Sequence, residues 1–152
     1  MKQYIGVKLI NAKPMTRAEY NAFRGWTVPA DENPADDGYL VEYLDGGKGN
    51  TDLYQGYVSW SPSEVFNNAY GPTDGMTFGL AIEAMKRGAK VARGGWNGKG
   101  MWLEYHAPMV DVDLPYIRMS YPVNSTPYPK GARVPWLASQ TDMLASDWTI
   151  VE

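Results

Sequence analysis

The stretch GPTDGMTFGLAIEAMKRG, residues 71–88, decides how the chain is organised. Its first part, Gly71 to Gly75, joins glycine, proline and aspartate in a run that breaks helices and strands and is typical of a linker. After it, Thr77 is placed to cap a helix over residues 78–87, which has apolar residues on one face and Gly88 at its end. The stretch therefore predicts two units, at residues 1–71 and 76–152.

The first unit alternates strand and helix signals. They predict, in order, a strand over residues 5–10, a helix over 17–24, strands over 39–44 and 54–60, and a helix that stops near residue 70. Two segments of the form S/T-x-x-E, starting at Thr16 and Ser61, predict capping boxes before the two helices. Gly25 is placed to end the first helix.

The second unit continues after the predicted helix 78–87 with short strands. They are predicted over residues 90–93, 101–105 and 116–119, followed by a long loop over 120–133, a short helix over 138–145 and a closing strand over 148–151. No long crossover helix is available for a parallel βαβ unit. The fold class is therefore predicted to be α+β, as two small units that each combine a mixed antiparallel sheet with helices.

Composition excludes several classes of function. The net charge is −3, and the residues up to 75 are more acidic than the rest, so neither half has the strong basic surface of a DNA or RNA binder. With no cysteine and one histidine, we expect no thiolate or multi-histidine metal site and no cofactor. The N-terminus alternates instead of forming a signal peptide, and no apolar run is long enough to span a bilayer. We therefore expect no membrane partner and a cytoplasmic location.

The strongest candidate for chemistry is the segment RGGWNGKG, residues 93–100. Its glycines let backbone N–H groups approach an anion, and Arg93 and Lys99 can offset phosphate charge. Trp96 offers a face on which a base can stack, and Asn97 can hydrogen-bond a base edge or a ribose hydroxyl. The alternative is a plain hairpin turn, because Asn97-Gly98 is a favoured type I′ pair.

A second candidate segment is PWLASQTDMLASDW, residues 135–148. Ser139 or Thr141 can cap a short helix, whose N-terminus favours anions. Alternatively, its two tryptophans belong to the core and the polar residues only cap.

An enzyme is less well supported by the sequence. A Ser-His-Asp triad would need His106, but no G-x-S-x-G elbow is present to expose a nucleophile. The carboxylate pairs Asp36/Asp37 and Asp111/Asp113 lie in polar or proline-flanked stretches and are interpreted as solvated surface. The glycines near Asn97 match neither a P-loop nor G-x-G-x-x-G. We therefore expect no catalytic residue.

Several segments of the second half together resemble a known family, the Thoeris anti-defence protein two family of phages. The matching segments are MTFGL at 76–80, VARGGWNGKGM at 91–101, PWLASQTDMLA at 135–145 and Asp147-Trp148, and their order and spacing agree with the family. Residues 1–75 lie outside this match and resemble a small phage-encoded segment of unclear role.

The resemblance implies a sponge. Members bind cyclic ADP-ribose isomers made by bacterial TIR proteins and withhold them from the downstream effector without degrading them. Some members also bind cyclic dinucleotides of CBASS systems. Members assemble as homotetramers. It implies that this chain acts in the cytoplasm of the infected bacterial host. The expected ligand-binding residues are Arg93, Trp96, Asn97, Lys99, Trp136, Ser139, Gln140, Thr141 and Asp142. The alternatives are a phage structural or protein-interaction module without a nucleotide ligand, and a hydrolase of the same signal.

Overall fold

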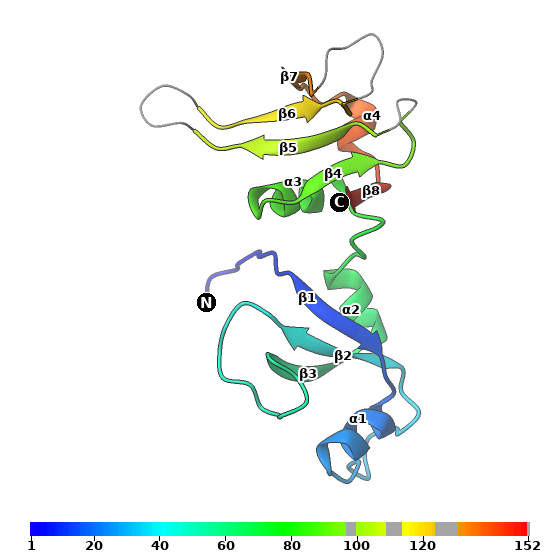
Figure 1. Cartoon of the computed structure of the whole chain (residues 1–152). Coiled ribbons are helices and arrows are strands. Elements are labelled where there is room, and N and C mark those ends of the chain that lie inside the picture. Colours follow the sequence, from blue (N-terminus) through cyan, green and yellow to red (C-terminus); the bar gives the residue numbers. More distant parts are fainter. Residues whose placement is uncertain (97–99, 109–113, 124–130, 152) are drawn as a thin grey trace. The chain divides into compact units, whose positions relative to one another are not determined.

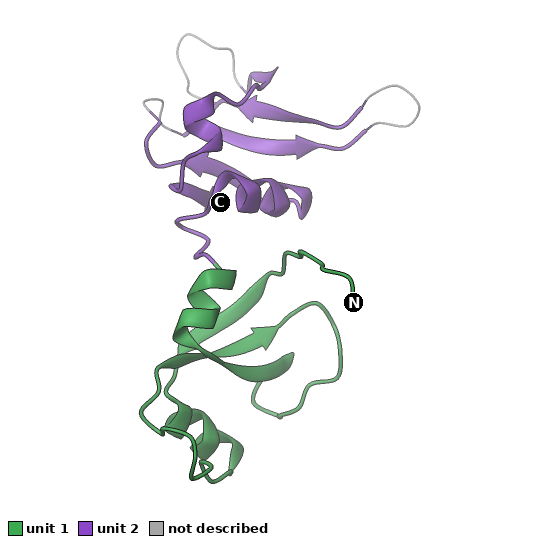
Figure 2. Cartoon of the chain, turned by 180° about the vertical axis from the view of Figure 1, so that it is seen from behind, with its two compact units in different colours: residues 1–70 green, residues 71–152 purple. Residues whose placement is uncertain are grey.

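The chain divides into two compact units, Met1–Tyr70 and Gly71–Glu152, each with its own sheet (Figures 1 and 2). The structure, a computed structural model, describes residues 1–96, 100–108, 114–123 and 131–151. Both sheets are antiparallel and both units also contain helices, so the predicted α+β class is confirmed. The boundary lies at the first residue of the predicted linker.

Unit 1 is a three-stranded sheet with two helices. Its elements, in chain order, are β1 (Ile10–Pro14), α1 (Arg17–Arg24), β2 (Gly38–Tyr43), β3 (Tyr57–Pro62) and α2 (Ser63–Ala69), and the strand order is β1-β2-β3. The capping box predicted at Thr16 is present, and Gly25 ends α1 with a positive φ of 69°. The core of unit 1 forms where Tyr20 of α1 packs with Leu40 and Val58 of the sheet.

Three local predictions for unit 1 were wrong. The first strand begins at Ile10 instead of residue 5, because β2 is only long enough to pair with residues 10–14. The strand predicted from residue 54 begins at Tyr57, since the N–H groups of Gln55 and Gly56 bond the Glu42 carboxylate. The second capping box does not form: Pro62 occupies the N-cap position of α2, and no side chain caps that helix.

Unit 2 is a five-stranded sheet with one longer and one short helix. Its elements are α3 (Phe78–Lys86), β4 (Lys90–Arg93), β5 (Trp102–His106), β6 (Tyr116–Ser120), β7 (Arg133–Pro135), α4 (Gln140–Met143) and β8 (Trp148–Val151). The strand order is β7-β6-β5-β4-β8, so the last strand returns to the edge beside β4. Thr77 caps α3 as predicted. The strand β7 was not predicted; it begins at the last residue of the predicted loop 120–133 and pairs with β6.

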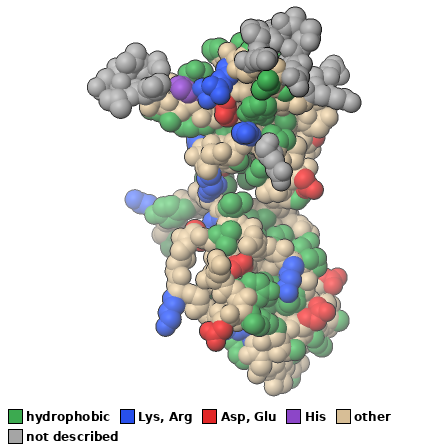
Figure 3. Space-filling model, viewed as in Figure 1, with side chains coloured by type: hydrophobic (Ala, Val, Ile, Leu, Met, Phe, Trp, Pro, Cys, Tyr) green, Lys and Arg blue, Asp and Glu red, His purple; other side chains and the backbone are tan. Residues whose placement is uncertain are grey.

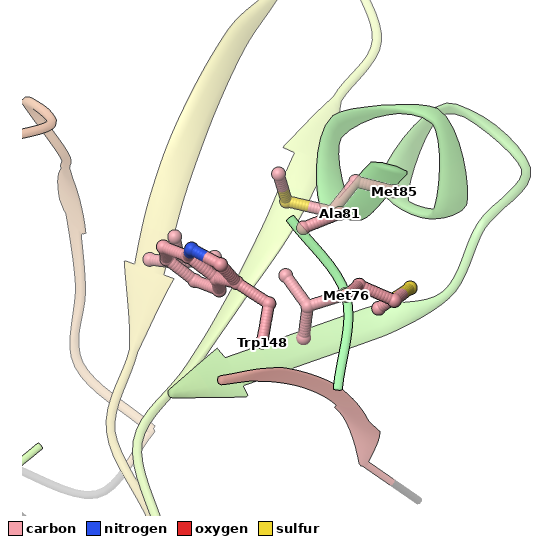
Figure 4. Close-up of a cluster of buried hydrophobic side chains, with 6 residues drawn as sticks. Met76, Ala81, Met85 and Trp148 are labelled. Atoms are coloured by element: carbon pink, nitrogen blue, oxygen red, sulfur yellow. The ribbon is translucent and has the colours of Figure 1, made fainter. Parts of the chain in front are cut away.

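The core of unit 2 lies between α3 and the strands β4, β5 and β8. Its buried side chains are Met76, Ala81, Met85, Val91, Leu103 and Trp148, and Figure 4 shows this cluster. Trp148 is fully buried and comes from the first position of β8. The core therefore fixes the place where β8 begins, and with it the end of β4, which pairs there. Within the described ranges, no helix has both the length and the apolar character that a membrane span needs.

Candidate functional site

The two segments singled out in the sequence meet where β4 ends and β8 begins. Arg93, the last residue of β4, pairs with Trp148, the first residue of β8. Beyond this pair the two segments remain hydrogen-bonded, because Gly94 N–H donates to the carbonyl of Asp147 at 3.1 Å. The short helix α4 precedes β8 directly. Residues 93–96 and residues 139–148 thus form one site.

Asp142 is the centre of this site. Its Oδ1 accepts hydrogen bonds from Arg93 Nη1 at 2.9 Å and from Trp96 Nε1 at 3.2 Å. Its Oδ2 accepts from the backbone N–H of Ser139 at 3.1 Å and from the Ser139 hydroxyl at 2.6 Å. Asp147 completes the arrangement by accepting from Arg93 Nε at 2.8 Å. We call Arg93, Trp96, Ser139, Asp142 and Asp147 the Asp142 cluster.

The local sequence explains why Asp142 points into the cluster. Ser139 and Asp142 form a capping box at the start of α4: the Ser139 hydroxyl accepts from the Asp142 N–H at 3.1 Å, and the Asp142 carboxylate reaches back to the Ser139 N–H. This reciprocal capping fixes the carboxylate at the N-terminal end of the helix. Trp148 Nε1 also donates to the Asp142 carbonyl at 3.1 Å, which ties α4 to the core.

The carboxylates of the cluster are held in their charged form. Burial raises the pKa of Asp142, but the hydrogen bonds from Ser139, Arg93 and Trp96 outweigh it and hold this pKa at about 2. The hydrogen bond from Arg93 lowers the pKa of Asp147 as well, and the Gly95 N–H adds to the effect. The pKa of Arg93 is raised in turn by Asp147 and Asp142. The cluster is therefore ionised at neutral pH.

The positive charge of Arg93 is compensated by carboxylates of the protein itself. Its guanidinium donates to Asp142 and Asp147, and the cluster holds one positive and two negative side chains. An anion bound to Arg93 would have to compete with two carboxylates already in place. The expected role of Arg93 as a phosphate partner stays a prediction, and the geometry gives it a clear structural role in joining β4 to α4 and β8.

Three indoles surround the cluster. The ring of Trp96 lies 5.5 Å from that of Trp148, edge to face, and 6.2 Å from that of Trp136. Trp96 and Trp136 are both half-buried and pack against the core of unit 2, whereas Trp148 is fully buried. Because Trp96 and Trp136 are only partly buried, each keeps some aromatic surface that a planar ligand can contact.

Gly95 lies in close contact with Asp147. Gly95 N–H donates to Asp147 Oδ2 at 2.8 Å, and a Cβ at this position would lie 3.0 Å from the same oxygen. A side chain at position 95 would therefore require the carboxylate to shift by a few tenths of an ångström. The backbone N–H of Gly95 thus binds a carboxylate of the protein itself. The sequence had instead predicted that backbone N–H groups of this glycine-rich segment contact an external anion.

The predicted ligand-binding residues are distributed unevenly around the cluster. Arg93, Trp96, Ser139 and Asp142 belong to it, and Trp136 lies against Trp96. Gln140 and Thr141 are exposed on α4, with Thr141 Oγ1 2.9 Å from the Ser139 hydroxyl. Asn97 and Lys99, together with the predicted Asn97-Gly98 turn, lie outside the described residues.

Sequence reasoning missed the part that Asp147 and Trp148 play. Both belong to the segment that was singled out, but neither was expected to shape the site. Asp147 supplies the second carboxylate on Arg93, and Trp148 supplies the buried wall behind Trp96. The signal for Asp147 was its charge: an acidic residue directly before a strand that pairs with a strand ending in arginine.

Other chemistry in unit 2 lies apart from the cluster. Arg118 Nη1 is 3.3 Å from His106 Nδ1, and the His106 ring packs on Tyr116 at 4.8 Å between centroids. Glu104 accepts from Arg118 and from Ser120 in the same region of β5 and β6. Across the described parts of the chain, no group of three or more His, Cys, Asp or Glu residues is placed to hold a metal ion. On the face shown in Figure 3, basic side chains are interspersed with acidic ones.

Comparison with known proteins finds matches for the second unit. A family model described as the Thoeris anti-defense 2-like domain matches residues 76–151. The protein named Thoeris anti-defense 2 of Bacillus phage SP01 is 33% identical over 93 residues, an alignment that spans 50% of this chain and 94% of that protein. Both the end of β4 and the segment from α4 to β8 lie inside the matched range.

Proposed function

This chain belongs to the Thoeris anti-defense 2-like family, and from that premise we propose that it serves a phage by binding a cyclic nucleotide immune signal and holding it intact. The signal we propose is a glyco-cyclic ADP-ribose made by a TIR protein, with cyclic dinucleotides of CBASS systems as a further ligand class. An intracellular signal can be withheld only where it is made, so the proposal places the protein in the cytoplasm of the infected host.

The observation that carries the proposal is the coincidence of the family match with the Asp142 cluster. The matched residues include the whole cluster, and the cluster holds Trp96 beside Trp136 at the surface of a rigid core. A fixed aromatic platform supports stacking of a base, an interaction that contributes roughly 1–3 kcal/mol per base. Because the platform is already in place, binding would cost little ordering of the protein.

Binding without cleavage fits the chemistry of the site. A hydrolase needs a group that can accept or donate a proton near neutral pH. In the Asp142 cluster the two carboxylates have lowered pKa values and accept hydrogen bonds, four of them at Asp142. His106 contacts Arg118 and Tyr116 on β5 and β6 instead. We therefore propose a binding protein, not an enzyme.

Self-association is a further part of the proposal. The side chains of Leu137 and Leu144, on either side of α4, are 91% and 82% exposed. Exposed leucines next to a candidate site favour burial against a partner, and a second copy of the chain is the partner we propose, in a tetramer. A residue from such a copy can then contact the ligand as well.

One experiment tests the function. The full chain is incubated with 1″–3′ glyco-cyclic ADP-ribose, free ligand is removed, the protein is denatured by heat and the released compound is identified by mass spectrometry. We expect intact ligand. Cleaved ligand would instead identify a hydrolase, and absence of ligand would favour a structural or protein-interaction module; either result overturns the proposal. The same experiment with a cyclic dinucleotide tests the further ligand class.

A pair of tryptophan variants places the ligand. Loss of one stacking ring in Trp96→Ala is expected to weaken binding roughly 5- to 150-fold. Trp96→Phe keeps a ring but loses the N–H donor to Asp142, so we expect a smaller loss. Trp102→Ala removes another half-buried indole of unit 2, outside the cluster, and serves as the matched control. Equal affinities for Trp96→Ala and Trp102→Ala would show that the ligand does not stack on Trp96.

A further inference from the structure

Unit 1 contains an open cavity that the family match does not reach. It has a volume of about 550 Å³ and lies between α1, the segment that follows α1, and β3. This size is typical of small-molecule sites, which span roughly 300–1,000 Å³. The lining combines two cations with aromatic rings: Arg17, Arg24, Tyr20, Trp26, Tyr57 and Trp60. The matched family begins at residue 76, so the cavity belongs to a different part of the chain.

Arg24 carries an unsatisfied donor in this cavity wall. Its Nη1 is buried and has no hydrogen-bond partner among the described residues. A cation in the last turn of α1 is favoured by the helix dipole, which explains the positive charge at this position. The dipole does not explain a buried N–H without an acceptor, which costs roughly 1–3 kcal/mol and more for a charged group. Arg24 lines the cavity and forms no ion pair within the described residues, so an anion in the cavity would meet a positive charge that no carboxylate compensates.

Arg17, the other arginine of the lining, is already paired. It donates to Glu32 at 2.6 Å and to Asp36 at 3.3 Å, and its guanidinium lies 4.3 Å from the centre of the Trp60 ring. These contacts hold the segment after α1 against the helix. Of the two arginines, Arg24 is therefore the one with capacity for a ligand.

The aromatic rings of the cavity are held in place but not covered. Gly25 adopts a positive φ, and Trp26 N–H bonds back to the Asn21 carbonyl at 2.8 Å, which turns the Trp26 ring toward the helix. The Arg24 guanidinium lies 4.7 Å from the centre of that ring. Trp26 and Tyr57 remain 54% and 47% exposed. The exposed parts of the Trp26 and Tyr57 rings, beside the Arg24 guanidinium, form a platform for a flat ring.

The opposite wall is also fixed before any ligand binds. The Asn50 side chain bonds Val58 in both directions, accepting from its N–H and donating to its carbonyl, each at 2.8 Å. The Tyr20 hydroxyl donates to the same carbonyl at 3.4 Å. These bonds join the turn before β3 and helix α1 to one residue of the strand, so the cavity is formed in the free protein.

We propose that this cavity binds a small anion that carries a flat aromatic ring, with the carboxylate or phosphate on Arg24 and the ring against Trp26 and Tyr57. Nucleotides and aromatic carboxylates share this chemistry. The site is in unit 1 and does not depend on the proposed function of the Asp142 cluster in unit 2.

Calorimetric titration of the full chain tests the proposal with four probes: adenosine 5′-monophosphate, indole-3-acetate, adenosine and inorganic phosphate. We expect at least one of the two ring-bearing anions to bind, and adenosine and phosphate to bind at least tenfold more weakly than that anion. The difference in affinity between the two anions shows whether the site prefers a nucleotide or an aromatic carboxylate. Absence of heat with both anions, or equal affinity for adenosine 5′-monophosphate and adenosine, would overturn the proposal.

Variants locate the binding. Arg24→Ala and Trp26→Ala should each lower the affinity for the bound anion at least tenfold. Lys48→Ala removes an exposed positive charge from the same unit and should leave that affinity unchanged. Because Arg24→Ala also removes the contacts of Arg24 with Trp26 and Tyr20, hydrogen exchange in unit 1 is measured for this variant to show that the unit stays folded. Unchanged affinity in both Arg24→Ala and Trp26→Ala would refute the site. Binding should persist in Trp96→Ala, which separates this site from the one in unit 2.

Discussion

Replacement of Asp142 by asparagine tests whether the Asp142 cluster holds unit 2 together. The carboxylate accepts from Arg93 and Trp96 through one oxygen and from Ser139 through the other. Asparagine is nearly the same shape, but one oxygen becomes an NH₂ group, so a donor pair loses its acceptor whichever way the amide turns. The charge that stabilises Arg93⁺ is lost as well.

The size of the effect follows from the pKa of Asp142. A fall from 3.8 in the unfolded chain to about 2 in the fold corresponds to about 2 kcal/mol in favour of the folded state at neutral pH. The side chain is only 13% exposed, so solvent screening removes little of this. An unsatisfied donor adds about 1 kcal/mol. We therefore expect Asp142→Asn to lower the free energy of unfolding of unit 2 by about 2–3 kcal/mol at pH 6.

The dependence on pH separates a charge effect from simple loss of packing. Because the folded-state pKa is lowered, the carboxylate stabilises the fold fully above pH 3.8, and the contribution is lost as the pH falls toward 2. The charge-dependent part of the difference between wild type and Asp142→Asn should shrink to roughly one third at pH 2.5. Carboxylates other than Asp142 titrate in both proteins and largely cancel in the comparison.

The assay must report on unit 2 alone, because the chain has two units. Urea unfolding followed by the NMR signals of the Trp136 and Trp148 indoles, at pH 6 and pH 2.5, meets this need. Glu83→Gln neutralises a partly exposed carboxylate that pairs with the exposed Lys86 in the same unit, and should change stability little. A difference below about 0.5 kcal/mol at pH 6, or the same difference at both pH values, would refute the reasoning.

Glycine substitutions give further predictions. In Gly95→Ala the new Cβ would meet Asp147 Oδ2 at 3.0 Å, so we expect a loss of about 1–2 kcal/mol in unit 2 by urea unfolding, and no loss would show that the carboxylate moves freely. Gly79→Ala places a methyl group in open space on helix α3 and should stabilise unit 2 by about 0.5–1 kcal/mol, measured as a higher thermal midpoint. Gly25→Ala, at a φ of 69°, should instead destabilise unit 1 by about 1 kcal/mol, and a stabilising result would contradict the left-handed cap.

The elements predicted well from the sequence are those set by local signals. The cap at Thr16 and the glycine at 25 define both ends of α1, and Thr77 defines the start of α3. Each signal acts within a few residues of itself, so a short window of sequence contains the physics that decides it. Unit 2 strands with apolar runs between turn residues were found for the same reason.

The elements predicted poorly depend on partners far along the chain. The first strand begins at Ile10 because residues 10–14 face β2, and nothing local distinguishes them from the alternating residues before them. The short strand β7, with a proline at its end, exists only because β6 lies beside it. Ser61 and Glu64 have the pattern of a capping box, but pairing with β2 extends to Pro62 and leaves no box to form.

The candidate site was predicted as a set of residues but not as a set of interactions. Arg93 was expected to face a ligand because its segment is rich in glycine, yet its partners Asp142 and Asp147 lie 49 and 54 residues further along the chain. The sequence contains all three charges without showing which pairs they form. Pairing is decided by the sheet order, which places β8 beside β4.

The resulting charge arrangement constrains how the proposed ligand, a cyclic nucleotide, could be held. The Asp142 cluster has an excess of one negative charge, so it repels phosphate while it fixes the indole of Trp96. In the proposed complex a phosphate would either displace a carboxylate from Arg93 or bind cations beyond the cluster, while the ring would be recognised by Trp96 and Trp136. Lys99 of the same chain or a basic residue of a second copy can fill that role. If a second copy does so, ligand affinity and assembly are thermodynamically linked. Substitution of the exposed Leu137 or Leu144 near α4, which weakens the proposed contact between copies, would then also lower ligand affinity.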